Sequence, residues 1–107
     1  IRQFPSKIQC LCTRWRHTLS LAQFVRASSG LPADILGLGG RGYLATGMIA
    51  DVLVLDPRQY QENASFSEWD RLSSGVDHLL VNGGFAIKDG VVTQLRLGQP
   101  LRRKNLP

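Results

Sequence analysis

Apolar residues recur at helical spacing near the start of the chain. Four of them fall at positions i, i+3, i+4 and i+7, which places them on one face of a helix: Ile8, Leu11, Cys12 and Trp15. Pro5 precedes this stripe and is tolerated in the first turn of a helix. The pattern predicts an amphipathic helix whose apolar face is a packing surface.

A second helix is predicted to begin near Ser20. Ser20 and Gln23 have the spacing of a capping box, and Leu19 and Phe24 could form a hydrophobic staple. Gly30 lies near the expected end of this helix. The residues expected to share one of its faces are Leu21, Phe24, Val25 and Ser28.

A short third helix is predicted to open at Pro32 and to stop at Gly37 or Gly39. Residues 1–40 are therefore interpreted as a helical segment. From Arg41 onward the helical spacing ends and short apolar runs replace it, so residues 41–107 are interpreted as a small β-domain.

Short apolar runs alternate with turn signals in this second part. The strands that we expect are 43–44, 50–55, 77–81, 85–88 and 91–95. The dipeptides Asn82-Gly83 and Asp89-Gly90 stand between runs and predict tight hairpin turns. The predicted fold class is α+β: N-terminal helices followed by a small antiparallel or mixed β-domain.

The run Val52–Leu55 is entirely apolar, which is typical of a strand covered on both faces. Gly47 precedes the run at a position that fits a turn. Pro57 follows it and cannot donate a hydrogen bond to a continuing ladder. The sequence therefore predicts a buried strand that is entered through a glycine turn.

The connection over residues 58–75 is polar and lacks clear periodicity. Tyr60, Phe66 and Trp69 could anchor it to the surface through their aromatic rings. Long irregular connections inside compact domains are often lids or partner-facing loops. The sequence leaves both alternatives open.

Composition indicates one globular domain. The chain has 107 residues, of which 43% are hydrophobic and 20% charged, so it is not of the disordered class. No apolar run approaches membrane-spanning length, and we expect no membrane partner. The first residue is Ile1 rather than Met, which predicts that an upstream segment has been removed.

The net charge of +5 invites a nucleic-acid interpretation. Basic residues flank Trp15 and crowd the C-terminus, where cations and an aromatic ring could hold a nucleotide: Arg14, Arg16, His17, Arg102, Arg103 and Lys104. The remaining basic residues are scattered, and no nucleic-acid motif is present. The charge pattern therefore disfavours nucleic acid as a partner. A stand-alone basic interaction module remains the alternative hypothesis.

Candidate chemistry is sparse. Cys10 and Cys12 are too close together for a disulfide to constrain the fold, so we expect reduced thiols and a cytoplasmic location. His17 and His78 are isolated, so no metal-ligand cluster forms. The carboxylates lie among turns and strand ends, where Asp commonly bonds nearby amides: Asp51, Asp56, Asp70, Asp77 and Asp89. We name no catalytic, no cofactor-binding and no metal-binding residue in this chain.

Four blocks of residues, taken in order, resemble the C-terminal part of amidohydrolase-superfamily enzymes, and most closely the N-acyl-D-amino-acid deacylase (D-aminoacylase) group. They are Leu19-Ser20-Leu21 with Val25-Arg26 and Leu31-Pro32-Ala33; Leu36-Gly37-Leu38 with Arg41-Gly42; Gly47 with residues 50–57; and Val81-Asn82-Gly83 with Asp89-Gly90 and Thr93. The similarity extends over almost the whole chain.

This resemblance implies that the catalytic metal site and this chain belong to different parts of the enzyme. In that family the zinc ligands come from an upstream barrel, which would lie before Ile1. Residues 1–40 would then pack on the missing barrel, and residues 41–107 would form part of a composite β-sandwich. The full-length enzyme would hydrolyse non-peptide C–N amide bonds with zinc. This chain alone is predicted to bind no zinc and to be inactive. Its expected partners are the missing barrel or further copies of itself.

Overall fold

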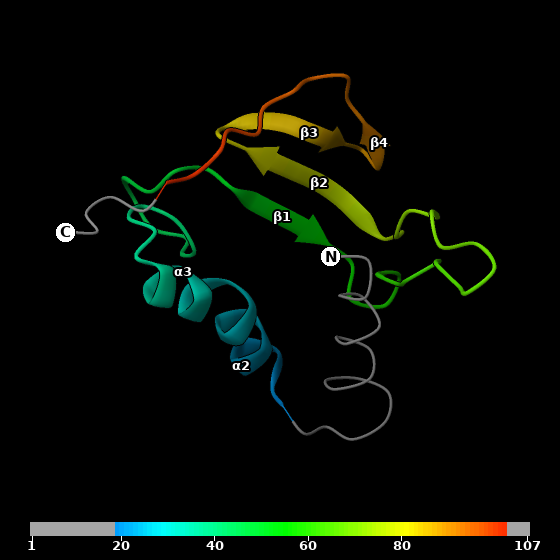
Figure 1. Cartoon of the computed structure of the whole chain (residues 1–107), viewed down its shortest axis with the longest axis horizontal. Coiled ribbons are helices and arrows are strands. Elements are labelled where there is room, and N and C mark those ends of the chain that lie inside the picture. Colours follow the sequence, from blue (N-terminus) through cyan, green and yellow to red (C-terminus); the bar gives the residue numbers. More distant parts are fainter. Residues whose placement is uncertain (1–18, 103–107) are drawn as a thin grey trace.

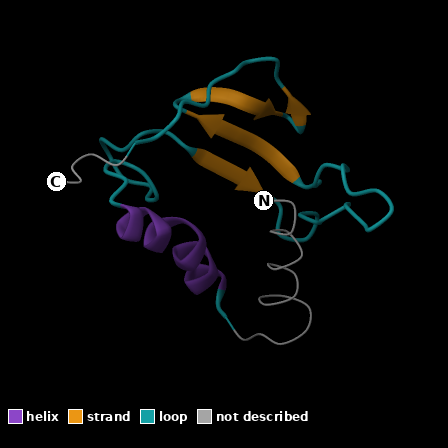
Figure 2. Cartoon of the chain, in the orientation of Figure 1, coloured by secondary structure: helices purple, strands orange, loops and turns teal. Residues whose placement is uncertain are grey.

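The computed structural model describes residues 19–102, and Figure 1 shows these residues in colour. The chain forms a helical run over residues 21–36 and then a sheet of four strands. The elements are α2 (Leu21–Val25), the π-helical η2 (Arg26–Gly30), α3 (Leu31–Leu36), β1 (Val52–Leu55), β2 (Val76–Val81), β3 (Gly84–Lys88) and β4 (Val91–Val92). The α+β class predicted from the sequence is confirmed, and Figure 2 shows the separation of helix from strand.

The helical run begins as the sequence predicts. The Ser20 hydroxyl accepts a hydrogen bond from the Gln23 amide at 3.2 Å, and the Gln23 side-chain oxygen accepts one from the Ser20 amide at 2.9 Å. This completes the capping box and satisfies two amides that the first helical turn leaves without partners. The run ends at Gly37, whose left-handed φ of 64° favours glycine.

The predicted third helix is present as α3, with Pro32 in its first turn and Gly37 after its last residue, but the break expected near Gly30 is absent. Gly30 has helical angles (φ −64°, ψ −48°), and η2 joins α2 to α3 without a break. Glycine stands here for a different reason, because a Cβ at this position would lie 2.8 Å from the Tyr43 ring. The predicted helix over residues 8–15 lies outside the described residues.

The strands form an antiparallel sheet in the order β1-β2-β3-β4. Val52 pairs with Leu80 in the first ladder, and register shifts occur between Val54 and Leu55 and between Leu79 and Leu80. The strand expected over 91–95 is shorter than predicted, since β4 holds two residues.

Both predicted hairpin turns are confirmed. Asn82 and Gly83 have φ values of 50° and 82°, and Asp89 and Gly90 have values of 51° and 77°. Positive φ at both central residues is the geometry of the type I′ turn, which matches the twist of the flanking strands. These two turns set the registers of the β2–β3–β4 meander.

Residues 43–44 do not form the predicted strand. The Tyr43 hydroxyl donates to Asp34 at 2.5 Å and accepts from Arg26 at 2.8 Å. The helical run therefore holds this residue, and no strand within residues 19–102 forms a ladder with it.

A small aromatic cluster joins the helical run to the sheet. Phe24 of α2 and Tyr60 of the connection after β1 are each 6% exposed, and Leu55 and Val76 pack against them. In Figure 1 the helical run accordingly lies on the β1 side of the sheet, away from β4. Burial raises the pKa of the Tyr60 hydroxyl above its ordinary value.

The connection between β1 and β2 is ordered by its own hydrogen bonds. Gln61 and Ser74 form an isolated antiparallel bridge, and the Asn63 side chain donates to the Leu72 carbonyl at 2.9 Å. Tyr60 is buried as an anchor, as predicted, whereas Phe66 is fully exposed and Trp69 is 69% exposed. The prediction of aromatic anchors is thus confirmed for Tyr60 and wrong for Phe66.

None of the helices in residues 19–102 combines the length and the apolar character that crossing a membrane requires.

Candidate functional site

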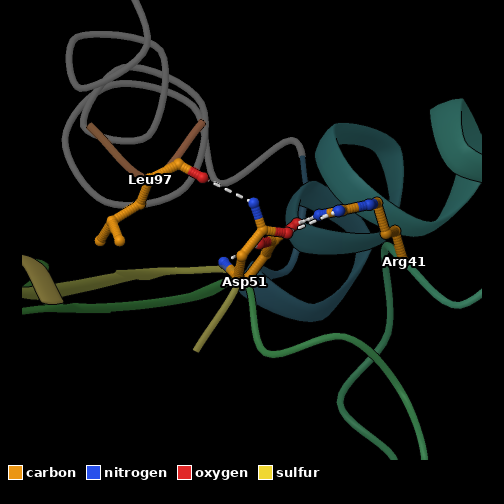
Figure 3. Close-up of polar contacts among 4 residues, drawn as sticks. Arg41, Asp51 and Leu97 are labelled. Carbon is orange, nitrogen blue, oxygen red and sulfur yellow. Dashed lines mark hydrogen bonds and ion pairs between the residues drawn. The ribbon is translucent and has the colours of Figure 1, made fainter. Parts of the chain in front are cut away.

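Four segments that are distant in sequence meet at one polar cluster, which we name the Arg41 junction: Arg41, Asp51, Asn82 and the Leu97 carbonyl. Arg41 follows the helical run, Asp51 precedes β1, and Asn82 lies in the β2–β3 turn. The guanidinium bonds the Asp51 carboxylate through Nη1 and the Asn82 side-chain oxygen through Nη2, the latter at 2.7 Å. Figure 3 shows the guanidinium directed at Asp51, and a dashed line running to the Leu97 carbonyl.

The backbone of the β2–β3 turn completes this junction. The Asn82 amide donates to Asp51 Oδ1 at 2.9 Å, and the Asn82 side-chain nitrogen donates to the Leu97 carbonyl at 2.7 Å. The Gly83 amide donates to the Ala50 carbonyl at 2.9 Å. Asn tolerates the left-handed conformation of this turn, so one residue serves both the turn and the cluster.

The charges of the Arg41 junction hold segments of the chain together. The Arg41 side chain is 16% exposed and the Asp51 side chain 35% exposed, so the pair is partly shielded from water. Both Asp51 oxygens accept hydrogen bonds within the protein, one from Arg41 and one from the Asn82 amide. A carboxylate held in this way is not placed to serve as a general base.

A second polar cluster fixes the chain just after the helical run. The Tyr43 hydroxyl lies between Arg26 and Asp34, whose charged groups are 3.7 Å apart. The pKa of the Arg26 guanidinium is raised, mainly by Tyr43 and to a smaller extent by Asp34. Gly42 allows the close approach, because a Cβ there would lie 2.5 Å from that of Ala33.

His78 takes part in a third cluster, on the sheet. Its Nδ1 accepts a hydrogen bond from the Asp89 amide at 3.2 Å, and its Nε2 lies 3.8 Å from Asp89 Oδ1. The Phe85 ring packs edge-on against the imidazole with 5.8 Å between centroids, and Lys88 Nζ lies 5.5 Å from the Phe85 centroid. One imidazole and one carboxylate are too few ligands for a structural zinc site.

The structure assigns contacts to several of the residues considered in the sequence analysis. Asp51 belongs to the Arg41 junction, and Asp89 contacts His78. Asp56 orders the turn after β1 by accepting from the Arg58 amide at 2.9 Å. Across residues 19–102, no three His, Cys, Asp or Glu side chains gather in a metal-binding arrangement. Cys10, Cys12, His17, Trp15 and its neighbouring arginines lie outside the described residues.

Sequence reasoning did not identify Arg41 and Asn82 as interaction partners. Both residues, together with Asp51, stand in the blocks that carry the family resemblance. Membership of those blocks was therefore the signal that could have linked them, because hydrophobic periodicity reports only local structure.

Apolar side chains remain exposed on both layers of the described structure. Leu53 and Val54 are neighbours in β1, so they point to opposite faces, and they are 46% and 42% exposed. The expectation that β1 is covered on both faces is thus wrong for this chain, because the helical run reaches only the end of the strand. On the helical run, Ile35 and Leu36 are 68% and 55% exposed.

No protein-family model matches the chain. Sequence comparison finds an N-acyl-D-glutamate deacylase of Alcaligenes xylosoxydans xylosoxydans, 38% identical over 79% of this chain and 17% of that protein. A D-aminoacylase of the same organism is 33% identical over 70% of the chain and 16% of its own length. A D-phenylhydantoinase of Escherichia coli is 35% identical over 80% of the chain and 21% of its own length.

Solved structures agree with these relatives. A D-aminoacylase structure superposes with a TM-score of 0.78 at 28% identity, covering 89% of this chain and 20% of that one. An N-acyl-D-glutamate deacylase from Bordetella bronchiseptica, complexed with zinc and a phosphonate inhibitor, gives a TM-score of 0.64 at 32% identity, covering 77% and 18%.

The chain spans about a fifth of the length of the relatives that it matches. The resemblance stated from its sequence blocks is confirmed in both sequence and fold. In sequence and in fold the chain is thus similar to one segment of D-aminoacylase-type proteins of the amidohydrolase family.

Proposed function

We propose that this chain is the non-catalytic C-terminal region of a D-aminoacylase-like amidohydrolase. Residues 19–40, as the described part of the 1–40 helical segment, pack on a metal-bearing barrel. Residues 41–107 form the small β-domain beside it. The full-length enzyme hydrolyses an N-acyl amide bond, and this region supports the barrel without touching the scissile bond.

One observation carries the proposal. Exposed apolar residues lie on both faces of β1 and along the helical run, although the polar contacts inside the chain are well formed. A self-sufficient domain buries such positions, whereas a segment that completes a larger body presents them to its neighbour. Leu53, Val54, Ile35 and Leu36 are the residues that we expect the barrel or another copy of the chain to cover.

The described residues do not fit a zinc ion. His78 and Asp89 make one close pair, and no third ligand joins them within residues 19–102. We therefore place the zinc of the full-length enzyme in the barrel, and derive no step of the reaction through this chain.

The alternative of a basic interaction module receives less support. Arg26, Arg41 and Arg71 each have an acidic partner within the described residues, namely Asp34, Asp51 and Glu68. Pairing neutralises much of the charge that would attract a polyanion. Salt-sensitive retardation of the chain by RNA or DNA in a gel would favour the alternative.

Two measurements test the proposal. The purified chain, supplied with zinc and N-acetyl-D-glutamate, is expected to release no acetate, and turnover would contradict the non-catalytic role. The reading frame upstream of Ile1 is expected to encode a barrel with a His-x-His pair. A stop codon in frame directly upstream would refute the assignment as part of a larger enzyme.

A further inference from the structure

The Asn82-Gly83 dipeptide of the β2–β3 turn is chemically able to deamidate. When Gly follows Asn, no side chain hinders attack of the Gly nitrogen on the Asn side-chain carbonyl carbon. The Gly83 nitrogen bonds to Asn82 Cγ, ammonia leaves, and a succinimide forms. Water then opens either carbonyl of the ring, which gives Asp or isoaspartate at position 82.

We propose that Asn82 is a deamidation site that the fold protects, and that its conversion loosens the attachment of residues 97–102 to the β2–β3 turn. This inference is independent of the proposed function. It rests on the described contacts of Asn82, Gly83 and Leu97.

Each group that must react is engaged in a hydrogen bond. The Gly83 N–H, which must lose its proton, donates to the Ala50 carbonyl at 2.9 Å. The Asn82 side-chain oxygen accepts from Arg41 at 2.7 Å, and its nitrogen, the leaving group, donates to the Leu97 carbonyl at 2.7 Å. The Arg41 bond fixes the side chain but polarises its carbonyl, so the protection is assigned to the two N–H bonds alone. If each of these contributes a factor of about five, the two together slow the reaction about 25-fold in the folded chain.

Conversion of Asn82 reverses the polarity of its contact with Leu97. A carboxylate has no N–H to donate, so two acceptor oxygens would face each other across the present 2.7 Å contact. The new carboxylate would also compete with Asp51 for the single guanidinium of Arg41. In isoaspartate, an added backbone carbon would distort a turn whose two central residues both have positive φ. Both products therefore break the hydrogen bond that attaches the Leu97 carbonyl to the turn, while the Leu97 side chain keeps its place over Gly84.

The rate of conversion tests the first half of the proposal. The full chain is incubated at 37 °C and pH 8, native or in guanidinium chloride, and Asn82 is followed by peptide mass spectrometry. Asn63, which also donates to a backbone carbonyl but precedes Ala64, is the internal control. We expect Asn82 to react faster than Asn63 in the unfolded chain, and about 25-fold more slowly in the native chain than in the unfolded one. Equal native and unfolded rates at Asn82 would overturn the protection argument.

Trypsin tests the second half, because Arg96 immediately precedes Leu97. In the variant Asn82→Asp we expect cleavage after Arg96 to accelerate about fivefold relative to cleavage after Arg71, the reference site in the β1–β2 connection. Asn82→Gly removes the same donor without adding charge and keeps the positive φ accessible, so it should give the same acceleration even if the Asp variant fails to fold. An unchanged Arg96-to-Arg71 ratio in the folded Gly variant would refute the role of Asn82 as the attachment of Leu97.

Discussion

Replacing Arg41 with Ala removes the only side chain that bonds both Asp51 and Asn82 in the described structure. The Asp51 carboxylate then keeps its hydrogen bond from the Asn82 amide but loses its cation. The Asn82 side-chain oxygen loses its donor altogether. The change thus weakens the connections among the helical run, β1 and the β2–β3 turn at one point.

The magnitude follows from burial and charge. Each of the two lost bonds involves a charged group and contributes about 1.5–3 kcal/mol when shielded. Asp51 is 35% exposed and water can replace part of what it loses, so about half of the sum remains. We expect Arg41→Ala to lower the free energy of unfolding by about 2 kcal/mol, or the melting temperature by about 10 °C.

Denaturant unfolding followed by circular dichroism is a suitable assay, with sulfate added if the parent chain is marginally stable. Arg71→Ala is the matched control, because its ion pair with Glu68 is exposed on both sides and should be worth less than about 0.5 kcal/mol. Arg41→Lys keeps the charge but not the planar fork, so it should fall between the two.

A double-mutant cycle with Asp51→Asn isolates the Arg41–Asp51 pair, and we expect a coupling of about 1 kcal/mol. Arg41→Ala and Arg71→Ala with equal stabilities would refute the conclusion that the Arg41 junction fastens these segments together.

Three further predictions concern backbone space, pH and a strand-edge hydroxyl. Gly75 and Gly47 both have a positive φ near 87°, but a Cβ at Gly75 would collide with the Gln59 backbone, whereas one at Gly47 would meet no atom within 4 Å. In thermal melts, Gly75→Ala should therefore lower the free energy of unfolding by more than about 3 kcal/mol, and Gly47→Ala by about 1 kcal/mol. The raised pKa of Tyr60 means that the folded state holds the hydroxyl proton more tightly, so this group's contribution to stability is complete below pH 10 and is lost as pH rises through the folded pKa. Tyr60→Phe should flatten the fall in stability measured above pH 10, and an unchanged slope would contradict the burial argument. Thr93→Val removes the hydrogen bond that the Thr93 hydroxyl donates to the Phe85 carbonyl at 2.7 Å, so it should lower the free energy of unfolding in urea by about 1 kcal/mol. An increase of the urea midpoint would count against that contact.

Local signals in the sequence predicted local structure well. The Ser20–Gln23 spacing gave the start of the helical run, and the two dipeptides ending in Gly83 and Gly90 gave both hairpin turns. These motifs succeed because each depends on hydrogen bonds or dihedral angles within a few residues. Gly30 misled the prediction because the cause of that glycine lies in the Tyr43 ring, thirteen positions away.

Long-range contacts were beyond such reasoning. Arg41 lies 10 residues from Asp51 and 41 from Asn82, and no periodicity connects these positions. The apolar run of β1 predicted covering layers but could not say which chain supplies them. In the described residues no such layer covers Leu53 and Val54, and the proposed function assigns it to the barrel or to another copy of the chain.

The two tight turns and the long connection before them imply an order of folding. Ile87 pairs with Val92 and Leu80 with Phe85 across short loops, whereas Val52 must find Leu80 across the whole β1–β2 connection. Hairpins with short loops close in microseconds, and closure of a longer loop costs more entropy. The β2–β3–β4 meander should therefore nucleate first during synthesis or refolding, with β1 and the helical run joining it afterwards.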